Sequence, residues 1–378
     1  MSEKIIWSVG YDGLGDKLDE IVVFLKAQQP FNTTWSSDYF KSKLIDNSNS
    51  NNGYLFYAEA ENKIIGVASL TKKIGILNGK NCVIAEVGDT FVSRAAQRRG
   101  APSTSFDPSL ASNHYINKSI FGRLISELLI AAKKDGVSLV YGTPNSQSFP
   151  GYTKQLGFFE EKFHNNCTFY RPRVQGAILE FSFLSRFKRG LFHMETFFDY
   201  LNSYLFVSFF GLSSEFISEP RVISGEIEDL WAKTSSGIGF GLQRDASYWQ
   251  KRYSPEMGKG YLFLALRNKT GSLVGLVVLR LLKTSRSRRG LAIVEWMGSE
   301  KINVSSVIAA AIYKMGRTEC YTHVYIWSGN RLSNDKIRLR FGLFFLKKNT
   351  PIIFRNLSPF DIQCSNKFVF HLGSTDAV

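Results

Sequence analysis

The amino-acid sequence predicts an α/β protein of two related domains, each a twisted mixed sheet flanked by helices, joined by a helical connector. Three observations predict this fold class. The chain has 378 residues, and at about 150 residues per domain that length favours two domains. Strand-like and helix-like segments alternate along it, and the order of segments in the first half recurs in the second. The expected boundaries are 1–175 for the N-terminal domain, 176–218 for the connector and 219–378 for the C-terminal domain.

The first half of the sequence begins with a segment typical of a strand, followed by one typical of a helix. Leu18, Ile21, Val22 and Leu25 recur at helical spacing, and Pro30 ends that helix. The polar stretch from residue 94 to 118 exceeds the length of an ordinary connection, so we expect a functional loop there. The predicted elements are a strand at 5–11, a helix at 16–29, a hairpin at 54–70 with its turn at 61–63, a strand at 81–93, a helix from residue 119, a strand at 136–145 and a brief helix ending at residue 157.

The second half repeats this order after the connector, which is rich in Phe, Leu and basic residues and predicts two helices. The two halves also end alike, because KQLGFFEEK (154–162) is similar to LRFGLFFLKK (339–348). The predicted elements are a helix at 227–233, a hairpin at 261–283, a strand at 291–298, a helix with apolar residues on one face from 304 to 315, and a strand at 322–328.

Composition narrows the class of protein. Hydrophobic residues make up 44% of the chain, which is enough for a sizeable core and excludes disorder for most of its length. Lys and Arg number 47 and Asp and Glu 32, and the resulting net charge of +15 predicts attraction to polyanions such as nucleotides, nucleic acid or anionic lipid headgroups. Charge alone does not choose among them.

Neither a metal nor a membrane span is expected. The four cysteines lack CxxC spacing and the five histidines lie far apart, which argues against a zinc site and a disulfide framework. The opening residues lack a secretory pattern, so a cytoplasmic location is expected. The apolar stretch 191–211 is interrupted by Glu195, Asp199 and Asn202. This favours a packing helix over stable membrane insertion, with contact at a membrane surface as the alternative.

The most informative region, residues 84–158, reads as a strand, a basic loop, a helix, a strand and a short helix. A strand that ends beside a helix N-terminus offers free N–H groups and a positive dipole end, which suit a pyrophosphate. Two stretches compete for that role, QRRGA (97–101) and INKSIFGRL (116–124), and the second is favoured because it abuts the helix. The basic residues that would strengthen the site are Arg94, Arg98, Arg99 and Lys118.

This region resembles the GNAT superfamily of CoA-dependent N-acyltransferases, in which a loop of the form [QR]xxGx[GA] grips the CoA pyrophosphate. INKSIFGRL is similar to the RGKGIF-type sequence of that family, and VYGTPNSQSFPGYTKQLGF (140–158) to its splayed strand, Asn and short helix. The resemblance implies tandem GNAT-like domains, with the pantetheine arm of acyl-CoA lying in the splay. The implied CoA-binding residues are Phe91, Val92, Asn117, Lys118, Ser119, Ile120, Phe121, Asn145 and Tyr152.

The same resemblance implies a tyrosine that protonates the departing CoA thiolate. Its expected place is occupied by Thr153, and Tyr152 lies one position earlier. Tyr152 is therefore the candidate general acid, with a packed aromatic as the alternative. A thiol with a pKa of about 8.5 is a fair leaving group without help, so a reaction without a general acid is the other alternative.

The PN turn followed by PGYTKQLGF resembles, more specifically, bacterial two-domain GNAT proteins of surface polysaccharide synthesis, such as lipopolysaccharide O-antigen or capsule. Some of these acylate the amine of dTDP-linked amino-dideoxyhexoses. The resemblance implies acetyl-CoA or a short hydroxyacyl-CoA as co-substrate. It also implies a nucleotide-linked amino sugar, for example a 3-amino-3,6-dideoxyhexose, as acceptor.

Acyl transfer to an amine needs a proton acceptor, either a carboxylate or a water held by one. Asp89 and Glu86 lie on the strand that would flank the acyl group, and their separation of three residues predicts opposite faces. Asp89, nearer the end of the strand, is the preferred base, with a structural carboxylate as the alternative. His114, in the long loop, is a second candidate base, with a solvated histidine as the alternative.

Candidate acceptor-binding residues lie in both halves. Arg94 follows the fourth strand of the first half. In the second half, RDASYWQKRY (244–253) groups side chains that suit stacking on a base and holding a diphosphate. The same side chains suit a helix packed against a sheet. They are Arg244, Trp249, Arg252 and Tyr253.

The sequence therefore favours an acyl-CoA-dependent N-acyltransferase that works by direct attack in a ternary complex, with acyl-CoA in the first domain and the acceptor near the cleft between domains. Nucleic acid is not an expected partner, and a homo-oligomer is left open. Two alternatives remain: an aminoacyl-tRNA-dependent peptide transferase, which also pairs GNAT domains, and a non-catalytic GNAT pair that binds RNA or an anionic membrane.

Overall fold

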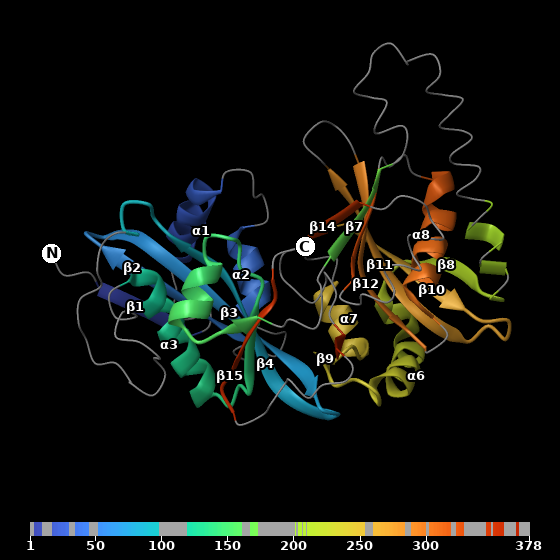
Figure 1. Ribbon diagram of the computed structural model, residues 1–378, viewed down its shortest axis with the longest axis horizontal. Helices are drawn as coiled ribbons and strands as arrows, with labels where there is room; N and C mark the ends of the chain where they lie inside the picture. The colour runs from blue at the N-terminus through green and yellow to red at the C-terminus, as the bar shows by residue number, and fades with distance from the viewer. Residues whose placement is uncertain are drawn as a thin grey trace, which may run out of the picture. The chain divides into compact units, whose positions relative to one another are not determined.

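The computed structural model in Figure 1 describes residues 4–9, 17–29, 35–44, 52–97, 119–160, 167–172, 201, 203–205, 207–208, 210–253, 260–283, 289–299, 302–318, 323–328, 345–348, 351–358 and 368–369. Contacts group the chain into two compact units. Unit 1 comprises Met1–Gly75, Lys80–Lys162 and Thr350–Cys364. Unit 2 comprises Ile76–Gly79, Phe163–Asn349 and Ser365–Val378. Each unit combines a mixed sheet with helices, which confirms the predicted α/β class.

The sheet of unit 1 has the strand order β1-β2-β3-β4-β5-β15-β6. The β4–β5 pair is parallel, whereas β1–β2, β2–β3, β5–β15 and β6–β15 are antiparallel. The strands are β1 (Lys4–Val9), β2 (Gly53–Ala60), β3 (Lys63–Leu77), β4 (Lys80–Val92), β5 (Leu139–Gly142), β6 (Phe159–Glu160) and β15 (Ile353–Asn356). The helices are α1 (Lys17–Gln28), α2 (Ser37–Leu44), α3 (Ile120–Lys134) and the short π-helix η3 (Gly151–Gln155).

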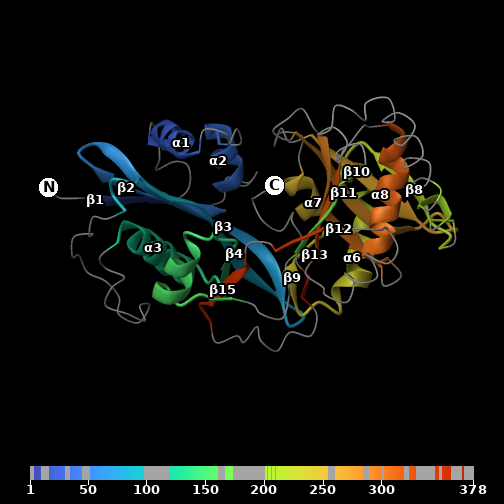
Figure 2. The ribbon, with the colours of Figure 1, turned by 45° about the horizontal axis from the view of Figure 1, so that its top comes forward.

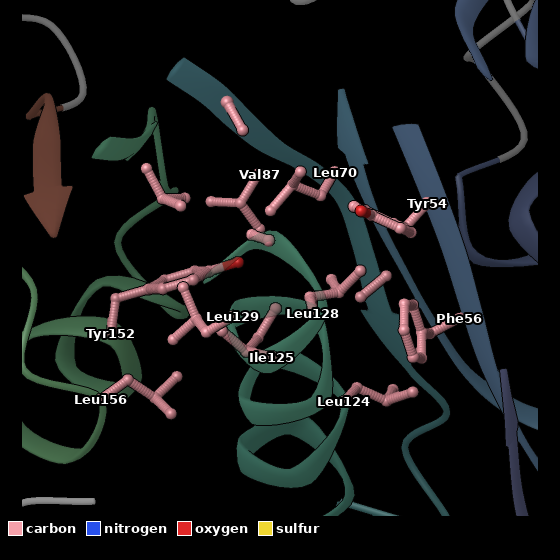
Figure 3. Close-up of a cluster of buried hydrophobic side chains, with 14 of the residues drawn as sticks. Tyr54, Phe56, Leu70, Val87, Leu124, Ile125, Leu128, Leu129, Tyr152 and Leu156 are labelled. Atoms are coloured by element: carbon pink, nitrogen blue, oxygen red, sulfur yellow. The ribbon is translucent and has the colours of Figure 1, made fainter. Parts of the chain in front are cut away.

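Helices cover both faces of this sheet (Figure 2). The face toward α3 carries Tyr54 and Phe56 of β2, which pack with Leu124 and Leu128 of α3 in the cluster shown in Figure 3. The opposite face packs against α1 and α2 through the alternate residues of β2, such as Leu55. This alternation follows from the two-residue period of a strand and makes it possible to assign each side chain of β3 and β4 to a face.

Two features of the first half of the chain were not predicted. A second hairpin joins β3 to β4 through Asn78 and Gly79, both with positive φ, and an Asn-Gly pair is the sequence signal for such a turn. Helix α2 was also missed. The Ser36 hydroxyl accepts a hydrogen bond from the N–H of Tyr39 at its start, and a serine at that position is a helix-start signal.

The sheet of unit 2 has the order β14-β7-β13-β12-β11-β10-β8, and α8 packs on one face while α6 and α7 pack on the other. The strands are β7 (Cys167–Pro172), β8 (Ser213–Ile217), β10 (Tyr261–Arg267), β11 (Leu273–Lys283), β12 (Arg289–Gly298), β13 (His323–Ser328) and β14 (Phe345–Lys348). The helices are the 3₁₀ helix η5 (Pro220–Ile223), α6 (Ser224–Ser235), α7 (Ala246–Arg252) and α8 (Val304–Thr318). Two further short strands, β9 (Phe240–Leu242) and β16 (Phe368–Val369), pair with each other.

The units interleave along the chain, whereas the sequence analysis expected contiguous segments. Strand β15 lies late in the chain yet pairs with β5 and β6, where Ile353 and Phe354 are fully buried. Strand β7 comes early yet pairs with β13 and β14 of unit 2. The last part of the predicted helical connector is also different, because Ser213–Ile217 forms β8 and pairs with β10. Among the described residues, no helix is both long and apolar enough to cross a membrane.

Candidate active site

The strands β4 and β5 part inside unit 1. Their last paired residues are Val87 and Gly142, after which β5 ends while β4 continues to Val92. A Cβ on Gly142 would lie 2.7 Å from Val87 Cγ1, so the approach at this point requires a glycine. Pairing of the two strands therefore ends at a defined pair, and residues 88–92 of β4 lie beyond it; the predicted splay stays a prediction.

A β-bulge follows immediately on β4. Ala85 and Val87 belong to the cluster against α3, and Thr90 and Val92 return to that face. Two residues, Gly88 and Asp89, therefore separate Val87 from Thr90 where strict alternation allows one. Asp89 has φ of 43°, a conformation in which a non-glycine residue is uncommon. The extra residue turns the Asp89 side chain to the face covered by α1 and α2.

The Asp89 carboxylate is held by three side chains on that face. Trp35 Nε1 donates to Oδ1 at 2.9 Å, and Lys43 Nζ and Ser69 Oγ donate to Oδ2 at 2.6 and 2.9 Å. The Lys43 side chain is 3% exposed and that of Asp89 10%. Both carboxylate oxygens thus accept hydrogen bonds from protein donors, which agrees with the alternative of a structural carboxylate.

Glu86 lies on the same face as Asp89, so the expectation of opposite faces was wrong. It forms a salt bridge with Lys73 of β3, and Tyr141 OH donates to it at 3.5 Å. Lys73 and Ser69 lie four residues apart on one strand, so their partners share a face. The physical reason is the bulge, which adds one residue between Glu86 and Asp89 and cancels the alternation.

Tyr152, the candidate general acid, is a buried member of the cluster against α3 (Figure 3). Its hydroxyl lies 3.1 Å from Thr90 Oγ1, which in turn donates to Gly88 O. Its ring meets those of Phe121 and Phe158 edge-on at 5.1 Å. Burial raises the pKa of Tyr152 well above its usual value. These contacts match the alternative of a packed aromatic side chain. The hydroxyl still contacts Thr90, the residue that directly follows the bulge.

Helix α3 begins where the sequence placed it, at Ser119. The Ser119 hydroxyl accepts a hydrogen bond from the N–H of Gly122 at 3.0 Å, so it serves as the N-cap. Phe121 lies over the start of η3, where a Cβ on Gly151 would come within 2.7 Å of its ring. This close approach joins the start of α3 to the segment that carries Tyr152.

The cap of α3 gives a first testable prediction. Ser119→Ala should lower the free energy of unfolding by about 1 kcal/mol, because one N–H of the first turn loses its acceptor. Ser119→Asn keeps an acceptor oxygen and should stay within about 0.5 kcal/mol of the wild type. Urea denaturation measures both. Equal losses in the two variants would contradict a capping role.

Asn145 stabilises the turn that precedes η3. Its Oδ1 accepts hydrogen bonds from the N–H groups of Gln147 and Ser148 at 3.0 and 2.9 Å. The side-chain oxygen is therefore occupied by the backbone, while the residue itself is exposed. Its place directly after β5 agrees with the predicted motif, and the side chain fixes the turn that leads away from the parting strands.

The other predicted site residues fall into three groups. Phe91 lies on the face toward α1 and α2, edge-on to Trp35 at 5.2 Å, and Val92 packs on the α3 face with Ile120. Arg94 is exposed in the turn after β4. His114, Asn117 and Lys118 lie outside the described residues. Within the described residues, no group of three or more His, Cys, Asp or Glu side chains is placed to hold a metal.

The predicted acceptor-binding side chains of unit 2 come together, but inside the core. Trp249 is 0% exposed and stacks on Tyr253 at 5.5 Å, and its Nε1 donates to Arg244 O at 2.9 Å. With its ring enclosed, Trp249 offers no surface on which a base can stack. The substrate-binding assignment of Arg244, Trp249 and Tyr253 is therefore corrected to the packing alternative, while Arg252 is partly exposed.

The residue that organises this cluster, Glu295 of β12, was missed by the sequence analysis. It is 0% exposed and forms a salt bridge with Arg244. Tyr248 OH donates to it at 2.8 Å and Tyr253 OH donates to it as well. Burial, together with the charge of Glu295, raises the pKa of Tyr253 well above its usual value. An isolated Glu in an apolar strand (LAIVEWMG) was the available signal, because a buried charge requires a partner.

The fold is that of two GNAT-like domains in tandem. A GCN5-related N-acetyltransferase from Anabaena variabilis is similar with a TM-score of 0.59 at 11% identity, over 94% of this chain and 73% of that one. Saccharomyces cerevisiae N-myristoyltransferase with bound myristoyl-CoA has a TM-score of 0.55 at 10% identity, over 97% and 89%. A tandem GNAT protein from the clavulanic acid biosynthesis pathway has a TM-score of 0.52 at 10% identity, over 95% and 100%.

At these identities the similarity shows the fold alone. No protein-family model matches the sequence, and no curated protein matches it significantly. The GNAT part of the sequence resemblance thus agrees with the fold, whereas the narrower resemblance to acyltransferases of dTDP-linked sugars rests on the sequence motif.

Proposed function

We propose that the protein is an acyl-CoA-dependent N-acyltransferase whose reaction takes place in unit 1. The observation that carries this proposal is the parting of β4 from β5 after Val87 and Gly142, directly followed by the bulge at Asp89. The start of α3, capped by Ser119, packs beside the same strands through Ile120. The first-turn N–H groups and positive dipole end of α3 suit the CoA pyrophosphate, and the parted strands suit its pantetheine arm.

The reaction is a direct attack of an amine on the thioester. The amine nitrogen forms a bond to the acyl carbon, the carbon–sulfur bond breaks, and the CoA thiolate leaves with the electron pair. With a thiol pKa of about 8.5 the thiolate needs little help in leaving. The amine must lose a proton, and Asp89 is the carboxylate that lies beyond the last β4–β5 pair, so it is the proposed acceptor, through a bound water.

The proposed acceptor is the amine of a nucleotide-linked amino sugar, with a dTDP-linked amino-dideoxyhexose as the first choice. Support for this comes from the PN turn and the PGYTKQLGF sequence, and from the net charge of +15, which suits two anionic ligands. The similarity to known structures carries no information on the acceptor.

The test uses the full chain, radiolabelled acetyl-CoA and a panel of nucleotide sugars. Release of CoA is expected only when the sugar carries an amine, because the matched sugar with a hydroxyl at that carbon is a much weaker nucleophile. Turnover at saturating substrate should change little between about 50 and 200 mM salt, since a nucleotide sugar makes few charged contacts. Absence of acetyl-CoA binding in calorimetry would overturn the proposal as a whole.

The aminoacyl-tRNA-dependent alternative makes the opposite salt prediction. A protein that neutralises several tRNA phosphates should lose affinity steeply as salt rises. We expect no stable tRNA complex at physiological salt. Tight tRNA binding without amine-dependent release of CoA would favour that alternative.

A further inference from the structure

We propose that Lys43 is a positioning residue for acyl transfer, whose ion pair with Asp89 fixes the β4 bulge and thereby the faces to which Thr90, Phe91 and Val92 point. The catalytic part of this inference rests on the proposed function. The structural part, that Lys43 holds the bulge, stands on the geometry alone.

The bulge is held from outside the strand. Asp89 adopts a left-handed backbone conformation, which is uncommon for a non-glycine residue. Three side chains outside β4 donate to its carboxylate: Lys43 of α2, Ser69 of β3 and Trp35, which lies two residues before α2. Lys43 is the only charged one of the three, and its ammonium lies 2.6 Å from Asp89 Oδ2.

The bulge also determines to which face of the sheet the side chains of residues 90–92 point. Beyond Asp89, Thr90 reaches Tyr152 on the α3 face, while Phe91 meets Trp35 on the other face. Removing the extra residue from the register would turn each of these side chains to the opposite face, because the strand period is two. Phe91 and Val92, both implied CoA-binding residues, therefore depend on the pair formed by Lys43 and Asp89.

Unit 2 contains a similar combination of a strand bulge and an ion pair. The register of β11 with β12 shifts between Val278 and Leu279, so that Val294 is the extra residue on β12. Pairing of β12 with β13 ends at Ile293, and Glu295, directly after the extra residue, is bonded to Arg244. In both units an acid whose side chain is at most 10% exposed, at the bulge of the strand that parts from its neighbour, is paired with a buried cation from outside the sheet. The cations are Lys43 of α2 and Arg244, which lies between β9 and α7. The recurrence argues for a role in holding the bulge.

The experiment compares Lys43→Met with Lys43→Arg and with the control Lys72→Met. Lys72 lies on the same strand as Ser69 but pairs with Asp135 at 3.0 Å on the α3 face, away from Asp89. Amide hydrogen exchange of residues 88–92 and calorimetry with acetyl-CoA are measured on the full chain. Lys43→Met should speed exchange at 88–92 by about tenfold or more, because an unpaired buried carboxylate no longer holds the bulge.

Acetyl-CoA should then bind the Lys43→Met variant about tenfold more weakly, with Lys43→Arg restoring most of the affinity and Lys72→Met staying within about twofold of the wild type. If Lys43→Met does not fold, Ser69→Ala removes one donor to Asp89 and should speed exchange at 88–92 about threefold. Unchanged exchange at 88–92 in a folded Lys43→Met variant would overturn the proposal, as would equal effects of Lys43→Met and Lys72→Met.

Failure of the proposed function and failure of the Lys43 inference give different results. If the wild-type chain does not bind acetyl-CoA, the proposed function fails, while the exchange rates still decide whether Lys43 holds the bulge. If the wild type binds acetyl-CoA and Lys43→Met exchanges faster at 88–92 with unchanged affinity, Lys43 is structural only and its positioning role is overturned.

Discussion

Glu295→Gln should lower the free energy of unfolding of the protein by about 3–5 kcal/mol, the range expected when one partner of a buried ion pair is removed. Arg244 and Glu295 are both enclosed in the core of unit 2, with side-chain exposures of 2% and 0%. Glutamine keeps the size and an acceptor oxygen for Tyr248, but it removes the buried negative charge that lies against the Arg244 guanidinium. Urea denaturation followed by circular dichroism measures the loss.

The matched control is Glu226→Gln in the same unit. Glu226 also pairs with an arginine, Arg267, but its side chain is 40% exposed, and pairs exposed to solvent contribute about 0–1 kcal/mol. The double variant Arg244→Met with Glu295→Gln should recover part of the loss, because it removes the buried guanidinium together with the carboxylate that it faces. A loss below about 1 kcal/mol for Glu295→Gln alone would mean that other groups neutralise Arg244, contrary to the arrangement described above.

Local signals were sufficient to predict most elements. The predicted start of α3 at Ser119 is confirmed by its cap, and the apolar stripe from Val304 to Met315 is confirmed as α8. The hairpins at 54–70 and 261–283 are confirmed as β2–β3 and β10–β11. These elements are determined by residues close in sequence, namely turn residues, caps and the period of apolar side chains.

The features that were missed depend on contacts between residues far apart in sequence. Trp35 and Lys43 lie 54 and 46 residues before Asp89, so nothing near Asp89 announces its partners. The only local signal of the bulge is Gly88 inside the strand segment VIAEVGDTFV, and a glycine there does not show which residue takes the positive φ. Strand β15 joins β5 more than 200 residues after it, and a short apolar segment does not indicate which sheet edge it will join.

The residues of the candidate site also divide into those indicated by local sequence signals and those whose role depends on distant contacts. Asp89 was predicted because it lies on the strand that would flank the acyl group, whereas Phe91 and Tyr152 follow from the resemblance to GNAT enzymes; their roles stay predictions. The roles of Arg244 and Trp249 were left open between binding and packing, and burial decided for packing. Residue type alone does not separate these roles, since a stacking surface and a core helix use the same aromatic and basic side chains.

Asp89→Asn tests the proposed reaction most directly, with an expected fall in turnover of about 100-fold to 10,000-fold, the usual contribution of a positioned acid–base group. Asparagine tolerates the left-handed backbone at this position and still offers an acceptor oxygen, so the bulge should survive better than with other substitutions. Affinity for acetyl-CoA should therefore stay within about tenfold of the wild type. Turnover with the amino-sugar acceptor and calorimetry with acetyl-CoA measure the two quantities.

Comparison with Lys43→Met separates proton transfer from positioning. If Asp89 acts only through the bulge, both variants lose the same turnover and exchange equally fast at residues 88–92. If Asp89 also takes the amine proton, the turnover of Asp89→Asn falls much further than that of Lys43→Met. A loss below about fivefold in Asp89→Asn would leave Asp89 a structural carboxylate, with orientation of the two substrates as the main source of catalysis.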